Sequence, residues 1–158
     1  QQDPGPAVRQ VLALVGERCN VSRIWVCWGS GGQDARTDIL EWCAPGVPSL
    51  QRQLKKGPRA NLEEYARNFD ENGIFYCRDI RALPSRLRSI LEAQEISSVL
   101  QCALCQEGAS GGFVSFDKRS GSRYWTQTEV DTLAMISRCV GVFLRPEQLQ
   151  TTPGRDEG

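Results

Sequence analysis

Seven cysteines and no histidine define the chemistry open to this chain. Without histidine the chain alone can form no Ser-His-Asp triad, no Cys-His nucleophilic pair, no mixed Cys/His zinc site and no phosphohistidine. Cysteine redox chemistry, lysine chemistry and paired carboxylates remain open. Cys102 and Cys105 have the Cys-x-x-Cys spacing of redox pairs and zinc knuckles. They lie in an apolar, strand-like run, where side chains three apart point to opposite faces, so we expect structural thiols and no metal site.

The cysteine count also bears on location. The number is odd, and most cysteines lie inside apolar runs, which favours a reducing cytoplasm over a secreted disulfide framework. No signal peptide and no apolar stretch of about 20 residues is present, so no membrane insertion is expected. The 19 basic and 19 acidic residues give a net charge of zero, which argues against a nucleic-acid partner.

Three tryptophans form a second group that could bind a planar ligand: Trp25, Trp28 and Trp42. Because Trp25 and Trp28 are three residues apart on one predicted strand, we expect them to face opposite sides of a sheet. Trp42 is the best pocket candidate, since it lies where a strand gives way to a polar insertion over residues 48–73.

The charged side chains give weaker signals. The carboxylate pairs at 63–64 and 70–71 are typical of a solvated helix face and its end. The arginines at 78, 81, 86 and 88 are interspersed with acidic residues, so they do not predict a strong anion site. No glycine-rich phosphate loop is present.

The elements that must position these residues follow from periodicity and turn residues. Helical patterns occupy residues 8–16, a segment capped at Asn61, a helix beginning at Pro84, and a final helix that starts with the Thr126–Glu129 capping box and stops at Pro146. Strands are predicted at 23–28, 37–43, 74–77, 98–105 and 112–117, the last two as a hairpin around residues 107–111. The small residues Ala134, Ser137 and Gly141 on the last helix would permit close contact between helices.

This order predicts an α+β fold. With 158 residues, of which 40% are hydrophobic, the chain is sufficient for one domain with its own core. We expect a central antiparallel sheet of five to six strands, with the N- and C-terminal helices on one face. Residues 1–146 form the domain, and residues 147–158 are a polar tail or linker.

The last third of the chain resembles the closing segment of a GAF domain. Residues 111–144 contain a glycine, an apolar strand ending in Phe116-Asp117, a polar turn, Trp125, Thr126-x-x-Glu129 and a leucine-rich helix. Upstream, residues 41–47 (EWCAPGV) are similar to the strand end of a bacterial GAF subgroup. Leu83-Pro84 and Ile96-Ser97-Ser98 match later landmarks of that subgroup.

The resemblance implies a bacterial, non-catalytic sensory domain. The sheet face opposite the terminal helices, roofed by the insertion, would bind an unknown small molecule. Such domains precede output modules of the same chain, here a diguanylate cyclase or a histidine kinase of a two-component system. The terminal helices would form a homodimer that passes the signal on. Bilin-binding relatives commonly follow their cysteine with histidine, which is missing here, so no covalent chromophore and no other cofactor is expected.

The pocket side chains expected from position are Trp42, Cys43, Tyr65 and Tyr76. No catalytic residue is predicted. Two alternatives remain: a cysteine-based redox enzyme similar to free methionine sulfoxide reductase, which is a GAF enzyme, and a domain that binds nothing and serves as a dimerisation spacer.

Overall fold

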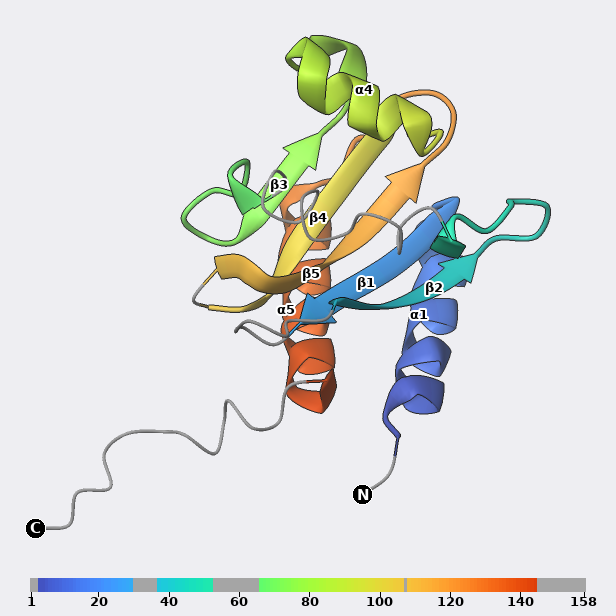
Figure 1. Ribbon diagram of the computed structural model, residues 1–158, viewed down its shortest axis with the longest axis vertical. Helices are drawn as coiled ribbons and strands as arrows, with labels where there is room; N and C mark the ends of the chain where they lie inside the picture. The colour runs from blue at the N-terminus through green and yellow to red at the C-terminus, as the bar shows by residue number, and fades with distance from the viewer. Residues whose placement is uncertain (1–2, 30–36, 53–65, 107, 145–158) are drawn as a thin grey trace, which may run out of the picture.

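A five-stranded antiparallel sheet forms the centre of the chain (Figure 1). The structure is a computed structural model, and it describes residues 3–29, 37–52, 66–106 and 108–144. The strands are β1 (Arg23–Gly29), β2 (Thr37–Cys43), β3 (Ile74–Cys77), β4 (Ser98–Cys105) and β5 (Gly108–Lys118). Their order across the sheet is β2-β1-β5-β4-β3, and every neighbouring pair is antiparallel.

Helices cover the two faces of this sheet unequally. The long helices α1 (Gly5–Cys19) and α5 (Gln127–Leu144) pack on one face, which we call the helix face. The short helices η1 (Ile80–Ala82) and α4 (Ser85–Ala93) pack on the other, together with the described ends of the insertion. We call this second face the insertion face. The predicted α+β architecture, with five strands and both terminal helices on one face, is confirmed.

Two hydrophobic cores result, one on each side of the sheet. Strand β1 contributes to both, because successive side chains point to opposite faces. Ile24, Val26 and Trp28 pack on the helix face, whereas Trp25 and Cys27 are buried on the insertion face. The prediction that Trp25 and Trp28 face opposite sides is therefore confirmed.

The first helix continues three residues beyond its predicted end at Gly16. Gly16 lies inside α1 and not at its end, because the helix crosses the ring of Trp42 there. A Cβ atom on Gly16 would lie 2.2 Å from Cζ3 of Trp42. The helix ends instead at Asn20, whose φ of 55° is the left-handed conformation that closes a helix.

The last helix begins as predicted. The Thr126 side chain accepts a hydrogen bond from the Glu129 N–H at 3.1 Å, and the Glu129 carboxylate accepts one from the Thr126 N–H at 2.8 Å. This reciprocal pair is the capping box. The predicted role of Gly141 in contact between helices is wrong, because this residue packs against the sheet: a Cβ atom there would lie 2.3 Å from the Leu104 carbonyl oxygen. Ser137 is also buried, and its hydroxyl donates to the Leu133 carbonyl at 2.8 Å.

Strand β5 begins four residues earlier than predicted. Cys105 pairs with Gly108, and the ladder shifts register between Ala103 and Cys105. Gly112 therefore lies inside the strand with a φ of 137°, where a Cβ atom would approach the Cys27 carbonyl oxygen to 2.3 Å. The start of the helix predicted from Asn61, the carboxylates at 63–64 and the tail at 147–158 lie outside the described residues. Of the described residues of that predicted helix, Ala66 is helical and Phe69 is not. No described helix combines the length and apolar character needed to cross a bilayer.

We expect the substitution Gly16→Ala to destabilise the domain, although alanine is the better helix former. Overpacking against Trp42 costs about 1–3 kcal/mol, and the higher helix propensity of alanine recovers about 1 kcal/mol. Urea denaturation, followed by far-UV circular dichroism, measures the difference. In the double variant with Trp42→Leu the penalty should disappear. An equal penalty in both backgrounds would show that the close approach of helix and ring is not its cause.

Candidate functional site

The residues expected to form a pocket do not lie on one face. Trp42 packs with the helix-face core and contacts α1 at Gly16. Tyr76 is on the same face, because it lies opposite Leu100 in the β3–β4 ladder. Cys43 follows Trp42 in β2 and so points to the insertion face. Tyr65 lies outside the described residues. The expectation that Trp42 and Tyr76 line an insertion-face pocket is therefore wrong, because strand alternation turns them to the other side.

On the insertion face, Arg23 forms the centre of a buried polar cluster. Its side chain is fully buried, and its Nε lies 3.4 Å from Oε2 of Glu41, itself buried in the β2 strand. The two terminal nitrogens donate to the carbonyl oxygens of Gln94 (3.2 Å) and Pro48 (2.9 Å). The thiol of Cys43 is directed at the same Pro48 oxygen, 3.8 Å away.

Glu41 completes this cluster by holding the start of the insertion. One carboxylate oxygen accepts the Ser49 hydroxyl at 2.5 Å, and the other accepts the Leu50 N–H at 2.8 Å. A buried charge is costly unless it is paired and hydrogen-bonded, and both conditions are met here. The chain at residues 48–50 is thereby fixed on the sheet beside Arg23.

A second buried polar chain runs across the middle of the same face. The indole Nε1 of Trp25 donates to Oδ2 of Asp117 at 2.9 Å, and the Ser115 hydroxyl donates to Oδ1 of Asp117 at 2.6 Å. The amide Nε2 of Gln101 donates to the Ser115 oxygen at 3.1 Å. Gln101, Ser115 and Asp117 are all fully buried, and they come from the two central strands β4 and β5.

The pKa of Asp117 is raised to about 6. Burial is the main cause, since it disfavours the charged form. The hydrogen bonds from Ser115 and Trp25 and the positive charge of Arg23 oppose this effect, whereas the negative charge of Glu41 adds to it. Asp117 is therefore a carboxyl group that titrates close to neutrality inside the sheet.

This polar chain ends in an unsatisfied acceptor. The Oε1 atom of Gln101 is buried and accepts no hydrogen bond from any described residue. An unpaired buried acceptor costs about 1–3 kcal/mol unless a donor reaches it. Aromatic rings lie on the same face: Phe113 is 5.4 Å from both Trp25 and Phe69, centroid to centroid, and Phe69 is 6.3 Å from Phe75.

Sequence reasoning missed this group, although a signal was present. Ser115 and Asp117 are polar residues two positions apart in an otherwise apolar strand, so alternation puts both on one side of it, and Gln101 is a polar residue within the apolar neighbouring strand. Arg23 opens a strand of apolar residues in the same way. Polar side chains at buried strand positions require partners, and this requirement singles them out.

Five of the seven cysteines have raised pKa values. Burial raises the pKa of Cys27 and of Cys102 to about 12, and it also raises the pKa values of Cys19, Cys43 and Cys77. Reactive cysteines have the opposite shift. Within the described part of the chain, no group of three or more cysteine, aspartate or glutamate side chains is placed to hold a metal ion.

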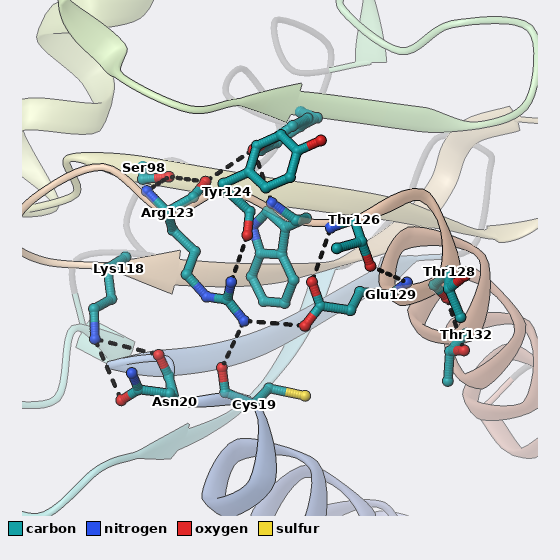
Figure 2. A network of polar contacts seen from close by, with 12 residues as sticks. Cys19, Asn20, Ser98, Lys118, Arg123, Tyr124, Thr126, Thr128, Glu129 and Thr132 are labelled. Carbon is teal, nitrogen blue, oxygen red and sulfur yellow. Dashed lines mark hydrogen bonds and ion pairs between the residues drawn. The ribbon is translucent and has the colours of Figure 1, made fainter.

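A different polar network joins the ends of the two long helices on the helix face (Figure 2). The Arg123 guanidinium donates to the Cys19 carbonyl at the end of α1 (3.2 Å) and to the Glu129 carboxylate of the α5 capping box (3.4 Å). It also lies 4.0 Å above the Trp125 ring. Positive charge favours the C-terminus of α1, and at the start of α5 Arg123 pairs with the carboxylate of Glu129, which caps that helix.

The edge strand β3 is part of this network through Tyr76. Its hydroxyl donates to the Arg123 carbonyl at 2.9 Å and accepts the Trp125 N–H at 3.0 Å. The Ser98 hydroxyl of β4 accepts the Arg123 N–H at 3.2 Å. Strand β3 follows directly from the insertion, so the insertion is connected through Tyr76 to the start of α5.

The arrangement has close parallels among solved structures. The GAF3 domain of Slr1393 from Synechocystis sp. PCC6803, in its photoproduct state, aligns with a TM-score of 0.71 and 17% identity, over 94% of this chain and 97% of that one. The far-red absorbing JSC1_58120g3, with bound biliverdin IXa, aligns with a TM-score of 0.70 and 18% identity, over 94% and 93%. This chain has a GAF fold.

A third GAF-fold relative comes from another kind of protein. A domain assigned to a two-component sensor histidine kinase of Sinorhizobium meliloti 1021 aligns with a TM-score of 0.64 and 12% identity, over 95% of this chain and 97% of that one. No protein-family model matches the sequence. No curated protein matches it either. The GAF fold is thus shared with these domains at a level of identity that establishes the architecture alone.

We expect Asp117→Asn to change how stability depends on pH. In the wild type, the raised pKa means that the folded state binds a proton more tightly than the unfolded state does, so this carboxyl contributes stability at low pH that is lost as the pH rises from about 4 through about 6. Asparagine cannot lose this proton. The difference in unfolding free energy, wild type minus variant, should therefore fall as the pH rises over this window.

Urea titrations at pH 4, 5, 6 and 7 measure that difference. Asp131→Asn, at an exposed position on α5, is the matched control for the removal of a carboxylate. A constant difference for Asp117→Asn would contradict a buried, readily protonated carboxyl.

Proposed function

We propose that this chain is a non-catalytic sensory domain that binds a small molecule on the insertion face and controls an output module of the same protein. The observation that carries the proposal is the buried polar chain ending at Gln101 Oε1. A domain that used this face only for packing would gain stability from an apolar residue there. A ligand with an N–H or O–H donor would satisfy the acceptor.

The surroundings of Gln101 suit a small planar molecule. The ring of Phe113 lies between Trp25 and Phe69 in the same core, and such a face accommodates flat, partly apolar ligands. Among the relatives, the far-red absorbing domain has bound biliverdin IXa, which is a molecule of this general kind. We propose non-covalent binding for this chain.

The response would travel from the insertion face to the long helices. Tyr76 connects strand β3 to the loop before α5, and Arg123 connects that loop to the end of α1. A ligand changes the equilibrium between two arrangements of these contacts only by its difference in affinity for them, a coupling typically of about 1–3 kcal/mol. In Figure 1, α1 starts and α5 ends at the same end of the molecule, where a further module would be attached.

The output module of this proposal is a diguanylate cyclase or a histidine kinase. The Sinorhizobium meliloti relative is assigned to a protein of the second kind. We also propose a cytoplasmic location, because the seven cysteines are free thiols and such a chain is best kept in a reducing compartment.

Native mass spectrometry of the protein purified from its own host tests ligand binding. The expected result is a non-covalent small molecule that is retained on the folded chain and lost on denaturation. Gln101→Met removes the acceptor at nearly constant volume and should reduce retention about tenfold, since one hydrogen bond to a buried acceptor is worth about 1–1.5 kcal/mol. Ser89→Ala on the exposed side of α4 is the control. A wild-type protein without any retained molecule would overturn the proposal.

Thiol alkylation distinguishes the sensory domain from a redox enzyme. At pH 7 we expect Cys27 and Cys102 to resist iodoacetamide until denaturant is added, because a pKa of about 12 leaves roughly one thiol in 100,000 ionised. Cys139, which is exposed on α5, should react first. Peptide mapping by mass spectrometry gives the order of labelling. Formation of an internal disulfide on addition of free methionine sulfoxide would instead support the reductase.

A further inference from the structure

The buried polar chain on the insertion face has a direction. The Trp25 indole donates to Oδ2 of Asp117 at 2.9 Å, and the Ser115 hydroxyl donates to Oδ1 at 2.6 Å. The Ser115 oxygen in turn accepts a hydrogen bond from Nε2 of Gln101 at 3.1 Å. The protons that Ser115 and Gln101 contribute to this chain therefore point toward Asp117, and the Oε1 atom of Gln101 lies at the far end without a donor among the described residues.

The charge of Asp117 imposes this direction. An ionised carboxylate only accepts hydrogen bonds, so the single proton of the Ser115 hydroxyl is directed at Asp117. The Ser115 oxygen is then an acceptor for its other neighbour, and the Gln101 amide must turn its NH2 group toward it. The position of Oε1 at the free end of the chain is thus a consequence of a charge that Gln101 does not contact directly.

A proton on Asp117 reverses the chain. The indole N–H of Trp25 can only donate and keeps Oδ2 as its acceptor, so the proton belongs on Oδ1, where it donates to the Ser115 oxygen. The Ser115 proton then needs another acceptor, and a turn of the Gln101 amide by 180° supplies Oε1 and moves Nε2 to the free end. Without this turn, two buried polar groups would lack a partner instead of one, which is the less stable arrangement.

We infer that the protonation of Asp117 decides which kind of ligand atom Gln101 binds. While Asp117 is ionised, the free end presents Oε1 and binds an N–H or O–H donor. Once Asp117 carries a proton, the free end presents Nε2 and binds an acceptor such as a carbonyl oxygen. Asp117 is a positioning residue, since it acts through Ser115. The binding of a ligand rests on the proposed function, whereas the reversal of the chain does not.

Neighbouring strands set the balance between the two states. Arg23 lies opposite Asp117 in the β1–β5 ladder and favours its ionised form, whereas Glu41 on β2 favours the protonated form. Strand β4 places the apolar Val99 opposite Asp117, and the buried residues of α4 are both leucines. The Cys27 thiol on β1 is neutral near pH 7, because burial raises its pKa to about 12. Asp117 itself, with a pKa of about 6, changes its charge just below neutral pH.

The reversal makes ligand affinity depend on pH. With a pKa of about 6, Asp117 is about 90% ionised at pH 7 and about 90% protonated at pH 5. A donor ligand that binds only the ionised state should therefore bind about tenfold more weakly at pH 5 than at pH 7. An acceptor ligand that binds only the protonated state should bind about tenfold more tightly at pH 5.

Proton–nitrogen NMR spectra of the 15N-labelled wild-type chain between pH 5 and pH 8 test the reversal without any added ligand. The indole N–H of Trp25 and the side-chain NH2 of Gln101 should shift together with one midpoint near pH 6, because both respond to the same proton. Trp25→Phe and Gln101→Met assign the two signals by their loss. A Gln101 signal that does not move while the Trp25 signal titrates would overturn the inference.

Two variants separate a reversed chain from a mere change of nearby charge. In Asp117→Asn, the amide NH2 of the new side chain donates to Ser115 as a protonated carboxyl does, so the Gln101 signal at pH 8 should match that of the wild type at pH 5. In Ser115→Ala, the link is removed, so the Trp25 signal should still titrate while the Gln101 signal stays constant. Asp131→Asn on the surface of α5 is the control and should leave both titrations unchanged. A Gln101 signal that titrates equally in Ser115→Ala would contradict the reversal.

Native mass spectrometry of the protein from its own host, at pH 5 and at pH 7, keeps this inference apart from the proposed function. A chain that reverses but retains no small molecule supports the reversal and contradicts ligand binding. A chain that retains a molecule although the Gln101 signal does not titrate supports ligand binding and overturns the reversal. Equal retention at both pH values, by a chain that does reverse, would contradict the control of ligand choice by Asp117.

Discussion

The burial of the Arg23 guanidinium is the constraint on which the insertion face depends. A positive charge removed from water requires partners on all sides, and Arg23 finds them in three separate segments: Glu41 on β2, the carbonyl of Pro48 and the carbonyl of Gln94. These contacts fix the start of the insertion and the turn before β4 relative to β1. Glu41, in turn, holds Leu50. The ionic cluster therefore fixes these segments beside the hydrophobic core of the insertion face.

The two faces of the sheet carry different kinds of groups, which agrees with the proposed sensory role. The insertion face carries buried polar groups, among them Asp117 and the unsatisfied Gln101, which suit recognition. The helix face carries two long helices whose ends meet at Arg123, which suits transmission. Tyr76 bridges the two, since it lies on the edge strand that leaves the insertion and bonds to the loop before α5. Packed interiors tolerate little compression, so a shift of β3 would also displace the residues packed against it.

Much of the fold follows from local patterns that act over short distances. The bounds of β2, β3 and β4 and the capping box of α5 agree with the structure because alternation, turn residues and cap hydrogen bonds are local effects. The predicted end of α1 at Gly16 was wrong because that prediction was also local: a glycine after an apolar run commonly marks the end of a helix. It is kept inside the helix by the ring of Trp42, which is 26 residues further along the chain. Gly141 is similar, since the Leu104 carbonyl, and not a partner helix, occupies the space beside it.

In the candidate site, too, some features follow from local patterns and others depend on contacts between residues distant in sequence. The sequence by itself determined that this chain builds an α+β domain with a central antiparallel sheet, that it lacks histidine chemistry, and that its last third resembles a GAF domain. It also determined that Trp25 and Trp28 face opposite ways. Alternation alone separates the neighbours Trp42 and Cys43, whereas only the tertiary structure decided that Trp42 and Tyr76 face the long helices. The physical reason is that alternation fixes the facing of residues relative to one another within a strand, whereas the absolute facing is set by packing between strands and helices distant in sequence.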